Sequence, residues 1–404
     1  MRFCQMPLLH KKAIKLIRRK MKTAIYTCHS GNLLVQPKSD ILQNEKVQLV
    51  LCFGNKQSIA EAGAYTLLNN TFPNAVITIC SAAGAIVNTS VEDNSFTATA
   101  IQFKKTTVQS HSVNIDDYAC SYEAGFSLMK EIDAAETKFI FLLSDGQKVN
   151  GSELIRGINE ANTTQIPVSG GLAADGYNFV STLTGVNAVP GKGNIIAIAL
   201  CGKELVVKYG TDAGWENFGP ERVVTKAVTN RLFEIDGKNA LDLYKKYLGK
   251  EADALPGSAL FFPLSLKLSE EAEPLVRTIL SIDNSDKSMV FAGDVPKGSK
   301  VRFMRANLDR LTNAATNAAI QTLDSNASIP KLAILVSCVG RKLVLNERID
   351  EELTAVDEVF RSQTILTGFY SYGEIAPCLT KDSSQLHNQT MSITTFYEIE
   401  QAAE

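Results

Sequence analysis

The sequence predicts an α/β (α+β) protein in which mixed β-sheets are covered by helices and divided between two domains. The first observation is length, because 404 residues exceed what one ordinary hydrophobic core holds. The second is a strand–helix–strand–turn–strand pattern that occurs three times along the chain. The third is that its strand-like runs are short and continuously apolar, which is typical of buried strands covered by helices.

Each of the three units begins with an apolar run, continues with a helical pattern and returns in a second apolar run. The first extends from VQLVLCFGN (47–55) to SFTATAIQF, the second from TKFIFLLSDG to NIIAIALCGKELVV, and the third from PKLAILVSCVG (330–340) to TMSITTFYEI. The turn after the second run carries a serine and a glycine in every unit: Ser81 with Gly84, Ser169 with Gly170, and Ser371 with Gly373. Equivalent turns should face similar clefts, where α/β sheets commonly bind ligands.

The chain between the second and third units predicts strands, the turn EIDGKNA and a helix over ALDLYKKYLG that ends at Gly249. The acidic stretch KEADALPGS (250–258) is the expected linker, and strands and a helix over NLDRLTNAATNAAIQTL follow it. The predicted division is a basic tail at 1–21, an N-terminal domain at 22–250 and a C-terminal domain at 251–404. Residues 1–20 lack the apolar stretch of a secretory signal, so we expect a flexible tail or a true start at Met21.

Composition predicts a cytoplasmic protein. The net charge of −2 gives no electrostatic footprint for nucleic acid, and no apolar run approaches the roughly 20 residues that span a bilayer. The eight cysteines form no C-x-x-C motif, and several lie inside apolar runs, where free cysteine behaves as a small core residue. This pattern suits a reducing compartment better than a disulfide framework.

Catalytic signatures are scarce. In GFYSYG, Ser371 lies one position too far from Gly368 for a nucleophile elbow, and Ser169 has no leading glycine. Neither VPGKGN nor SGGLAADG matches a dinucleotide-binding or phosphate-binding loop, so Gly170 and Gly171 are expected to permit a turn. Serine catalysis and nucleotide binding are therefore not predicted.

Metal binding is limited by the supply of histidine. The chain has His10, His29, His111 and His387, and none stands in H-x-x-x-H spacing. His387 lies in the polar stretch QLHNQT before the last strand-like run. Its imidazole could hold one axial position of a haem iron, or it could hydrogen-bond a small molecule or the backbone.

The stretch TGFYSYGEIAPC differs from the other two turns by its aromatic and acidic residues. Tyr370 and Tyr372 are two apart and share a face on a strand, beside Glu374. They could border an amphipathic ligand or be core tyrosines. Glu374 could accept a hydrogen bond from an ammonium or guanidinium group, or cap the turn. Asp175, after SGGLAA, could bind a ligand or only stabilise a turn.

Five stretches together resemble the FIST family of bacterial sensory proteins, which have an N-terminal and a C-terminal FIST domain. They are SGGLAADG, the segment from GTDAGWENFGP to ALDLYKKYLG, GDVPKGSKVRFM, GFYSYGEIAP and LHNQT, and the resemblance runs from about residue 45 to 398. It implies sensing of small ligands such as amino acids, read by kinases, chemotaxis receptors or cyclic-dinucleotide enzymes. No signature of an output domain remains once both domains are placed.

A stand-alone FIST protein resembles the nitric-oxide-sensing haemoproteins that regulate a histidine kinase. The resemblance implies a non-enzymatic sensor with haem b, His387 as the candidate iron ligand, a gaseous ligand and a cytoplasmic histidine kinase as partner. A sensor of a small organic ligand such as an amino acid, and an enzyme that uses Glu374 and His387, are the alternatives. The candidate ligand-binding residues are Ser169, Gly170, Gly171, Asp175, Tyr370, Ser371, Tyr372, Glu374, His387 and Asn388.

Overall fold

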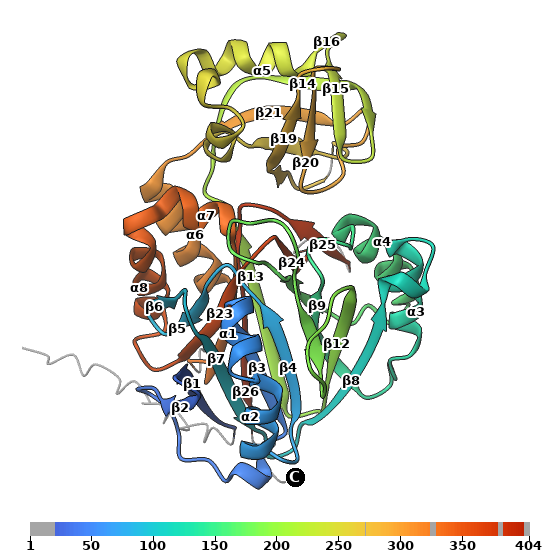
Figure 1. The fold of residues 1–404 in the computed structure, drawn as a ribbon. Helices are drawn as coiled ribbons and strands as arrows, with labels where there is room; N and C mark the ends of the chain where they lie inside the picture. Colours follow the sequence, from blue (N-terminus) through green and yellow to red (C-terminus); the bar gives the residue numbers. More distant parts are fainter. Residues whose placement is uncertain (1–20, 271, 324–328, 379–382, 400–404) are drawn as a thin grey trace, which may run out of the picture.

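A computed structural model describes residues 21–270, 272–323, 329–378 and 383–399. Three six-stranded mixed sheets form a larger body, and a smaller β-rich unit sits on one end of it (Figure 1). The predicted fold class is therefore confirmed. The basic tail predicted at 1–21 lies outside the described residues except for Met21, whose side chain is buried.

The three sheets are mixed and have six strands each. The first has the order β11 (Thr184–Val186), β4 (Val76–Ser81), β3 (Leu49–Gly54), β7 (Phe96–Gln102), β1 (Lys22–His29), β2 (Asn32–Val35). The second has the order β25 (Ser384–His387), β24 (Gly373–Pro377), β10 (Val168–Leu172), β9 (Thr137–Ser144), β12 (Asn194–Cys201), β8 (Thr107–Asn114). The third has the order β13 (Leu205–Asp212), β26 (Met391–Glu398), β22 (Leu332–Cys338), β23 (Ile365–Ser371), β5 (Ala85–Val87), β6 (Ser90–Glu92).

The predicted threefold repeat is confirmed by the strand pairing. Each sheet has a parallel pair made by the first two apolar runs of one unit, namely β3 with β4, β9 with β10 and β22 with β23. The third run of the unit, β7, β12 or β26, lies antiparallel beside the first. Because a parallel pair needs a crossover, helices connect these strands and cover the outer faces.

Helices cover the outer face of each sheet (Figure 1). They are α1 (Lys56–Glu61) and α2 (Ala64–Thr71) on the first sheet, α3 (Ser121–Lys130) and α4 (Gly151–Ala161) on the second, and α6 (Leu308–Gln321), α7 (Val339–Leu345) and α8 (Ile349–Val359) on the third. Short 3-10 helices are η1 (Asn44–Lys46), η2 (Ile115–Asp117) and η5 (Asn346–Arg348). No helix among the described residues is long and apolar enough to cross a membrane.

The chain after each second strand crosses to a neighbouring sheet and interlocks the units. Strand β5 of the first unit pairs with β23 of the third, β24 of the third pairs with β10 of the second, and β11 of the second pairs with β4 of the first. One backbone hydrogen bond is repeated at each crossing: Ala83 N to Tyr370 O (2.9 Å), Tyr372 N to Leu172 O (3.2 Å) and Ala174 N to Ser81 O (2.9 Å). The three sheets thus close around a common core.

These hydrogen bonds correct the alignment of the three turns. Ser81 is equivalent to Leu172 and Tyr370, so the expectation that Ser81, Ser169 and Ser371 are equivalent is wrong. The three serines occupy different positions when the strands are aligned, because the units share a backbone path and little sequence.

Apolar side chains from all three sheets fill the space between them. Phe53 of the first sheet stacks on Phe369 of the third, with ring centroids 4.7 Å apart, and Phe141 of the second belongs to the same cluster. The strands are buried on both faces, which explains why they read as continuous apolar runs in the sequence.

The smaller unit is inserted between the second and third units of the body. Its sheet has the order β18 (Leu275–Arg277), β17 (Leu264–Lys267), β21 (Lys300–Arg305), β14 (Glu216–Val228), β15 (Arg231–Ile235), β20 (Ser288–Phe291), β19 (Ile279–Asp283), and β16 (Lys238–Asn239) pairs with β15. Helix α5 (Ala240–Leu248), η3 (Gly249–Ala254) and η4 (Gly257–Phe261) complete it. Residue 250, the predicted division between domains, lies in η3, and β14 and β21 pair across it.

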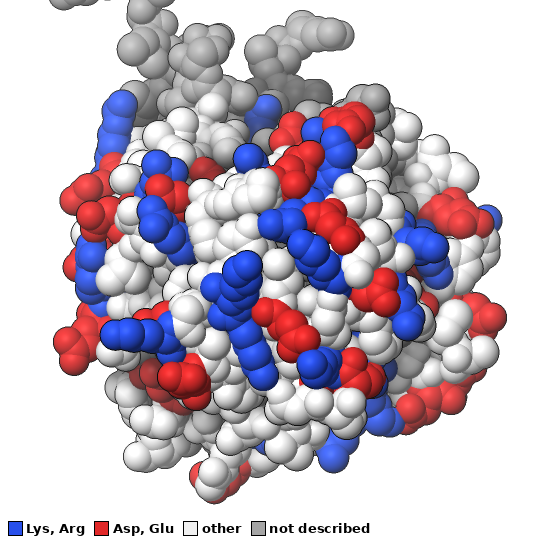
Figure 2. Space-filling model, turned by 90° about the horizontal axis from the view of Figure 1, so that it is seen from above, with Lys and Arg blue, Asp and Glu red and all other residues white. Residues whose placement is uncertain are grey.

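Lys and Arg side chains alternate with Asp and Glu over the outer face of this unit (Figure 2). The chain leaves the body after β13 and returns to it at α6. Its core has apolar residues of its own, with Tyr244, Phe291 and Phe303 fully or almost fully buried. The smaller unit therefore packs as a separate body joined to the larger one by two chain crossings.

Candidate functional site

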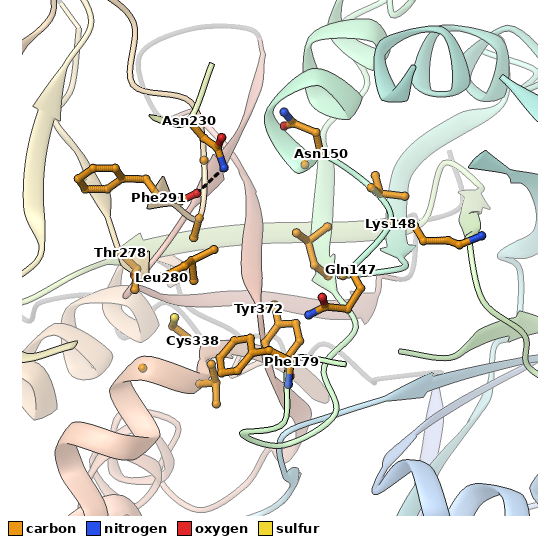
Figure 3. Close-up of a pocket in the computed structure, with 18 of the residues that line it drawn as sticks. Gln147, Lys148, Asn150, Phe179, Asn230, Thr278, Leu280, Phe291, Cys338 and Tyr372 are labelled. Atoms are coloured by element: carbon orange, nitrogen blue, oxygen red, sulfur yellow. Dashed lines mark hydrogen bonds between the residues drawn. The ribbon is translucent and has the colours of Figure 1, made fainter. Parts of the chain in front are cut away.

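A cavity of about 360 Å³ lies where the smaller unit meets the body, at the ends of β9, β22 and β23 (Figure 3). Its lining residues from the body are Gly146, Gln147, Lys148, Val149, Asn150, Gly151, Leu172, Phe179, Cys338, Val339, Gly340 and Tyr372. Those from the smaller unit are Asn230, Leu260, Thr278, Leu280, Phe291, Ala292 and Gly293. A volume of this size suits a small organic molecule.

The loop between β9 and α4 supplies one wall, and its backbone is fixed by Asp145. The Oδ1 atom of Asp145 accepts hydrogen bonds from the backbone N–H groups of Gln147 (2.7 Å) and Lys148 (2.8 Å), and Oδ2 accepts one from Gly193 N (2.9 Å). The Gln147 amide is directed toward Tyr372, whereas Lys148 turns away and its ammonium binds Asp116 at 2.5 Å (Figure 3). This wall therefore presents an uncharged amide to the cavity.

An aromatic pair supplies the second wall. Tyr372 stacks on Phe179 with ring centroids 4.4 Å apart and an interplanar angle of 12°. Its hydroxyl donates to the Asp175 carboxylate, which also accepts the backbone N–H groups of Ser181 (2.9 Å) and Val180 (3.1 Å). Burial opposes the charge on Asp175, but these hydrogen bonds outweigh it and lower the pKa of that carboxyl. Asp175 is thus a carboxylate that fixes Tyr372.

The smaller unit closes the cavity with apolar and neutral polar groups. Leu280 and Phe291 contribute apolar surface, and the Asn230 amide donates to Phe291 O at 2.8 Å (Figure 3). The Thr278 hydroxyl is buried and has no hydrogen-bond partner within the described structure. It is therefore a polar group in the cavity wall with which no described residue pairs.

Hydrogen bonds join the units beside the cavity, among them one from the Asn150 amide to the Asp294 carboxylate at 3.4 Å. Ser152 Oγ, in the first turn of α4, accepts from Asp294 N at 3.2 Å, and the guanidinium of Arg277 donates to Leu386 O at 3.2 Å. Arg277 is almost completely buried, and burial lowers its pKa to about 10. Hydrogen bonds therefore fix the junction between the two units on both sides of the cavity.

Several predicted ligand-binding residues have structural roles away from the cavity. The Ser169 hydroxyl bonds Thr394 at 2.7 Å, and the Tyr370 hydroxyl donates to Glu352 at 3.1 Å in the core. Gly170 and Gly171 lie in β10, where a Cβ atom on Gly171 would be 2.7 Å from Val336. Of the predicted residues, Tyr372 lines the cavity and Asp175 supports it.

Glu374 is fully buried behind the cavity. Its carboxyl group accepts from Ser371 Oγ (2.7 Å), Thr390 Oγ1 (2.9 Å) and Thr390 N (3.1 Å). Burial raises its pKa to about 7, against these hydrogen bonds. Its partners are hydroxyl and amide groups, so the structure does not present it to an ammonium ligand.

His387 lies opposite Glu374 in the β24–β25 ladder and does not line the cavity. Its Nε2 atom is enclosed and has no partner within the described structure. Burial, with the nearby charge of Arg277, lowers the pKa of the imidazole to about 4, so it is neutral at pH 7. A haem iron would need that nitrogen to face open space. The residues as arranged here therefore do not fit a haem.

Asn388 and Gln389 follow His387 and are fully buried. None of their four side-chain amide atoms has a hydrogen-bond partner within the described structure. Asn388 was predicted from the sequence as a ligand-binding residue, whereas Gln389, Gln147 and Thr278 were not. The turn SDGQKVNG, placed between a strand and a helix, was the available signal for Gln147.

Opposite pH dependences are expected from Glu374 and His387. Because the pKa of Glu374 is higher in the folded protein than its unfolded value of 4.5, this group stabilises the fold below pH 4.5. That stabilisation is lost as the pH rises to about 7. The lowered pKa of His387 gives stability that is present above 6.5 and lost as pH falls to about 4. The two contributions oppose each other between pH 4.5 and 6.5.

Replacing one of the two groups removes its contribution, so the variant should show the pH dependence of stability that the other group produces. Relative to the wild type, Glu374→Gln should gain about 3 kcal/mol in unfolding free energy as pH rises from 4.5 to 7. His387→Gln should gain a similar amount as pH falls from 6.5 to 4. Urea unfolding across this range measures both, with exposed Glu358→Gln as the control. A pH-independent difference for Glu374→Gln would contradict the buried carboxyl.

Metal ligation has no support in the described part of the chain. Among those residues, no three His, Cys, Asp or Glu side chains are grouped to hold a metal ion. Six of the described cysteines, Cys28, Cys52, Cys80, Cys120, Cys201 and Cys338, are free, and burial raises the pKa of Cys338 at the cavity wall. Cys338 is therefore a thiol at neutral pH and not a thiolate ligand.

Comparisons with known structures give weak matches. One is a cyanuric acid hydrolase from A. caulinodans, at 8% identity and a TM-score of 0.36, covering 95% of this chain and 100% of that one. Another is a chorismatase, also at 8% identity and with a TM-score of 0.36, covering 94% of this chain and 98% of that one. TM-scores below 0.5 do not establish a common fold. A comparison with curated proteins finds none that matches.

Comparison with protein families gives matches over most of the chain. Residues 48–238 match the FIST N domain, and residues 240–377 match the FIST C domain. The border between the two matches falls at β16 and the start of α5, inside the smaller unit. The cavity is lined by residues from both matched regions. The chain therefore carries a FIST N domain followed by a FIST C domain.

Proposed function

We propose that the protein is a non-enzymatic sensor that binds a small organic ligand in the cavity between the body and the smaller unit. The observation that carries the proposal is that both units supply cavity walls. A ligand that contacts both favours one relative position of the units, and a partner can read that position. FIST domains are associated with sensing in signal transduction, which supports this class of function.

The lining favours an uncharged ligand. Gln147 and Thr278 offer an amide and a hydroxyl, and Tyr372, Leu280 and Phe291 offer aromatic and apolar surface. Lys148 is the one charged residue among those that line the cavity, and its ammonium is engaged by Asp116. The carboxylate and ammonium of a free amino acid would meet no opposite charge here, which ranks neutral molecules first.

A more specific alternative is a haem-dependent nitric oxide sensor in which His387 is the iron ligand. The enclosed Nε2 atom of His387 speaks against it. Absorption spectra after hemin addition test it: a Soret band that moves with nitric oxide and disappears in His387→Ala would establish haem sensing. Co-purification of a histidine kinase, as expected for a sensor, tests the partner class and distinguishes the sensor from an enzyme acting through Glu374.

A metabolite screen by thermal shift tests the proposed site. We expect neutral organic molecules to raise the melting temperature of the wild type. Leu280→Trp should weaken that binding by about tenfold or more, because a larger side chain fills the cavity from the smaller unit. Val189→Trp, at a position that is 75% exposed and does not line the cavity, is the matched control. Equal binding by both variants would refute the assignment.

A further inference from the structure

Three consecutive residues behind the cavity have polar atoms without partners. His387 Nε2 and both amide atoms of Asn388 and Gln389 are enclosed and lack any hydrogen-bond partner within the described structure. Buried donors and acceptors are almost always paired, because an unpaired one destabilises the fold. Two adjacent, fully buried amides with four unpaired atoms therefore require an explanation.

The backbone of this segment is firmly held, so the amides are not part of a loose loop. Gln389 O accepts from the Trp215 indole at 2.9 Å, and Thr390 O accepts from Cys338 N at 3.2 Å. Gln389 itself has a left-handed backbone, with φ of 60°. This conformation is costly for a residue other than glycine and is often found at functional sites.

Gln389 lies directly against the cavity wall. A Cβ atom on Gly340 would be 2.4 Å from Gln389 Nε2 and 2.7 Å from Oε1, so the amide packs on the Gly340 backbone. Gly340 and Cys338 line the cavity. A single glycine, without a side chain, thus separates the amide from the space proposed for the ligand.

The neighbouring charged groups are held by hydrogen bonds to other partners, although the buried Nε atom of Arg341 has no partner within the described structure either. The Arg341 guanidinium donates to Ala213 O (2.7 Å), Leu311 O (2.9 Å) and Glu352 (2.7 Å). The Glu374 carboxyl is held by Ser371 and Thr390. Rotating either group toward Gln389 would break existing hydrogen bonds, so a partner from outside the protein is the better explanation.

We propose that Gln389, with Asn388 beside it, is the recognition end of the cavity and binds the carboxamide of a ligand that is a primary amide or a lactam. A side-chain amide presents a donor next to an acceptor, and a carboxamide presents the complementary acceptor and donor. A carboxylate would set an oxygen against Gln389 Oε1, and a tertiary amide has no donor. Gln389 does not line the cavity in the structure as described, so the Gly340 backbone has to move aside when the ligand binds. This inference rests on the proposed sensor function and specifies its ligand.

The Gln389→Met variant tests this role, because it keeps the length of the side chain and removes both polar atoms. Without ligand, its melting temperature should rise by about 2 °C, since unpaired buried atoms are lost. Nicotinamide and 2-pyrrolidinone should raise the melting temperature of the wild type but bind the variant at least about tenfold more weakly. Nicotinate and N-methyl-2-pyrrolidinone should give no shift. Gln385→Met, in the strand β25 just before this segment, is the control.

The outcomes separate this inference from the proposed function. A Gln389→Met variant that melts lower than the wild type and keeps the nicotinamide shift would show that the amide is structural and overturn the inference. A second outcome is that other neutral molecules raise the melting temperature of the wild type but not of Leu280→Trp, while carboxamides give no shift. That result would overturn the inference and leave the proposed function standing. No shift from any neutral molecule would overturn the proposed function as well.

Discussion

A Glu352→Leu variant is expected to lose about 3–5 kcal/mol of unfolding free energy, because it leaves the Arg341 guanidinium buried without its counter-charge. Both side chains are completely buried, and Arg341 Nη2 lies 2.7 Å from Glu352 Oε2. Glu352 also accepts from the Tyr370 hydroxyl at 3.1 Å, so that group loses its partner too. Urea or thermal unfolding measures the loss.

A matched surface pair and a double variant check the reason for this loss. Glu351 pairs with Arg348 at 2.7 Å but is half exposed, so Glu351→Leu should cost about 0–1 kcal/mol. Arg341→Met combined with Glu352→Leu should recover much of the stability, since neither charge then remains buried. If the double variant is as unstable as Glu352→Leu, the uncompensated charge is not the cause.

Gly368→Ala is expected to prevent folding, or to cost about 4 kcal/mol or more. Gly368 has φ of 146°, and a Cβ atom there would be 1.8 Å from the carbonyl oxygen of Leu335 on the paired strand. Gly170 has the same conflict, with φ of 151° and Leu142 O at 1.8 Å. Neither strand can move, because both are packed on two faces. Yield of soluble protein and its melting curve measure the effect.

Gly298→Ala separates the cost of backbone strain from the cost of the steric clash. Gly298 has φ of 90°, but a Cβ atom there would meet no atom within 4 Å. Its substitution should therefore cost only the backbone strain of about 1 kcal/mol. Similar losses for Gly368→Ala and Gly298→Ala would contradict the close approach of β22 and β23.

The repeat could be predicted from the sequence because each strand is buried on both faces and each crossover is a helix. The alignment within the repeat could not. Position 79 of the first unit is isoleucine where the other two units have Gly170 and Gly368, so the shared glycine is missing from one copy. Serine was the visible common residue in the turns, and it occupies different levels in the three units.

The candidate site was predictable only in part. Tyr372 stands beside a glycine at a strand end, which is where the sequence pattern directed attention. Thr278 and Leu280 come from an inserted unit and carry no motif, because their role depends on how that unit docks on the body. Gln389 was hidden for another reason: its side chain is buried and unpaired, a property of packing that spacing in the sequence does not express.

Hydrogen exchange with and without a bound neutral ligand tests the central claim, that one molecule bridges the two units. The informative segments are residues 146–151 of the body and 291–293 of the smaller unit, which line opposite sides of the cavity. Slower exchange in both segments, absent in Leu280→Trp, is the predicted result. Protection of one segment alone, or of neither while the ligand is bound, would contradict a site shared between the units.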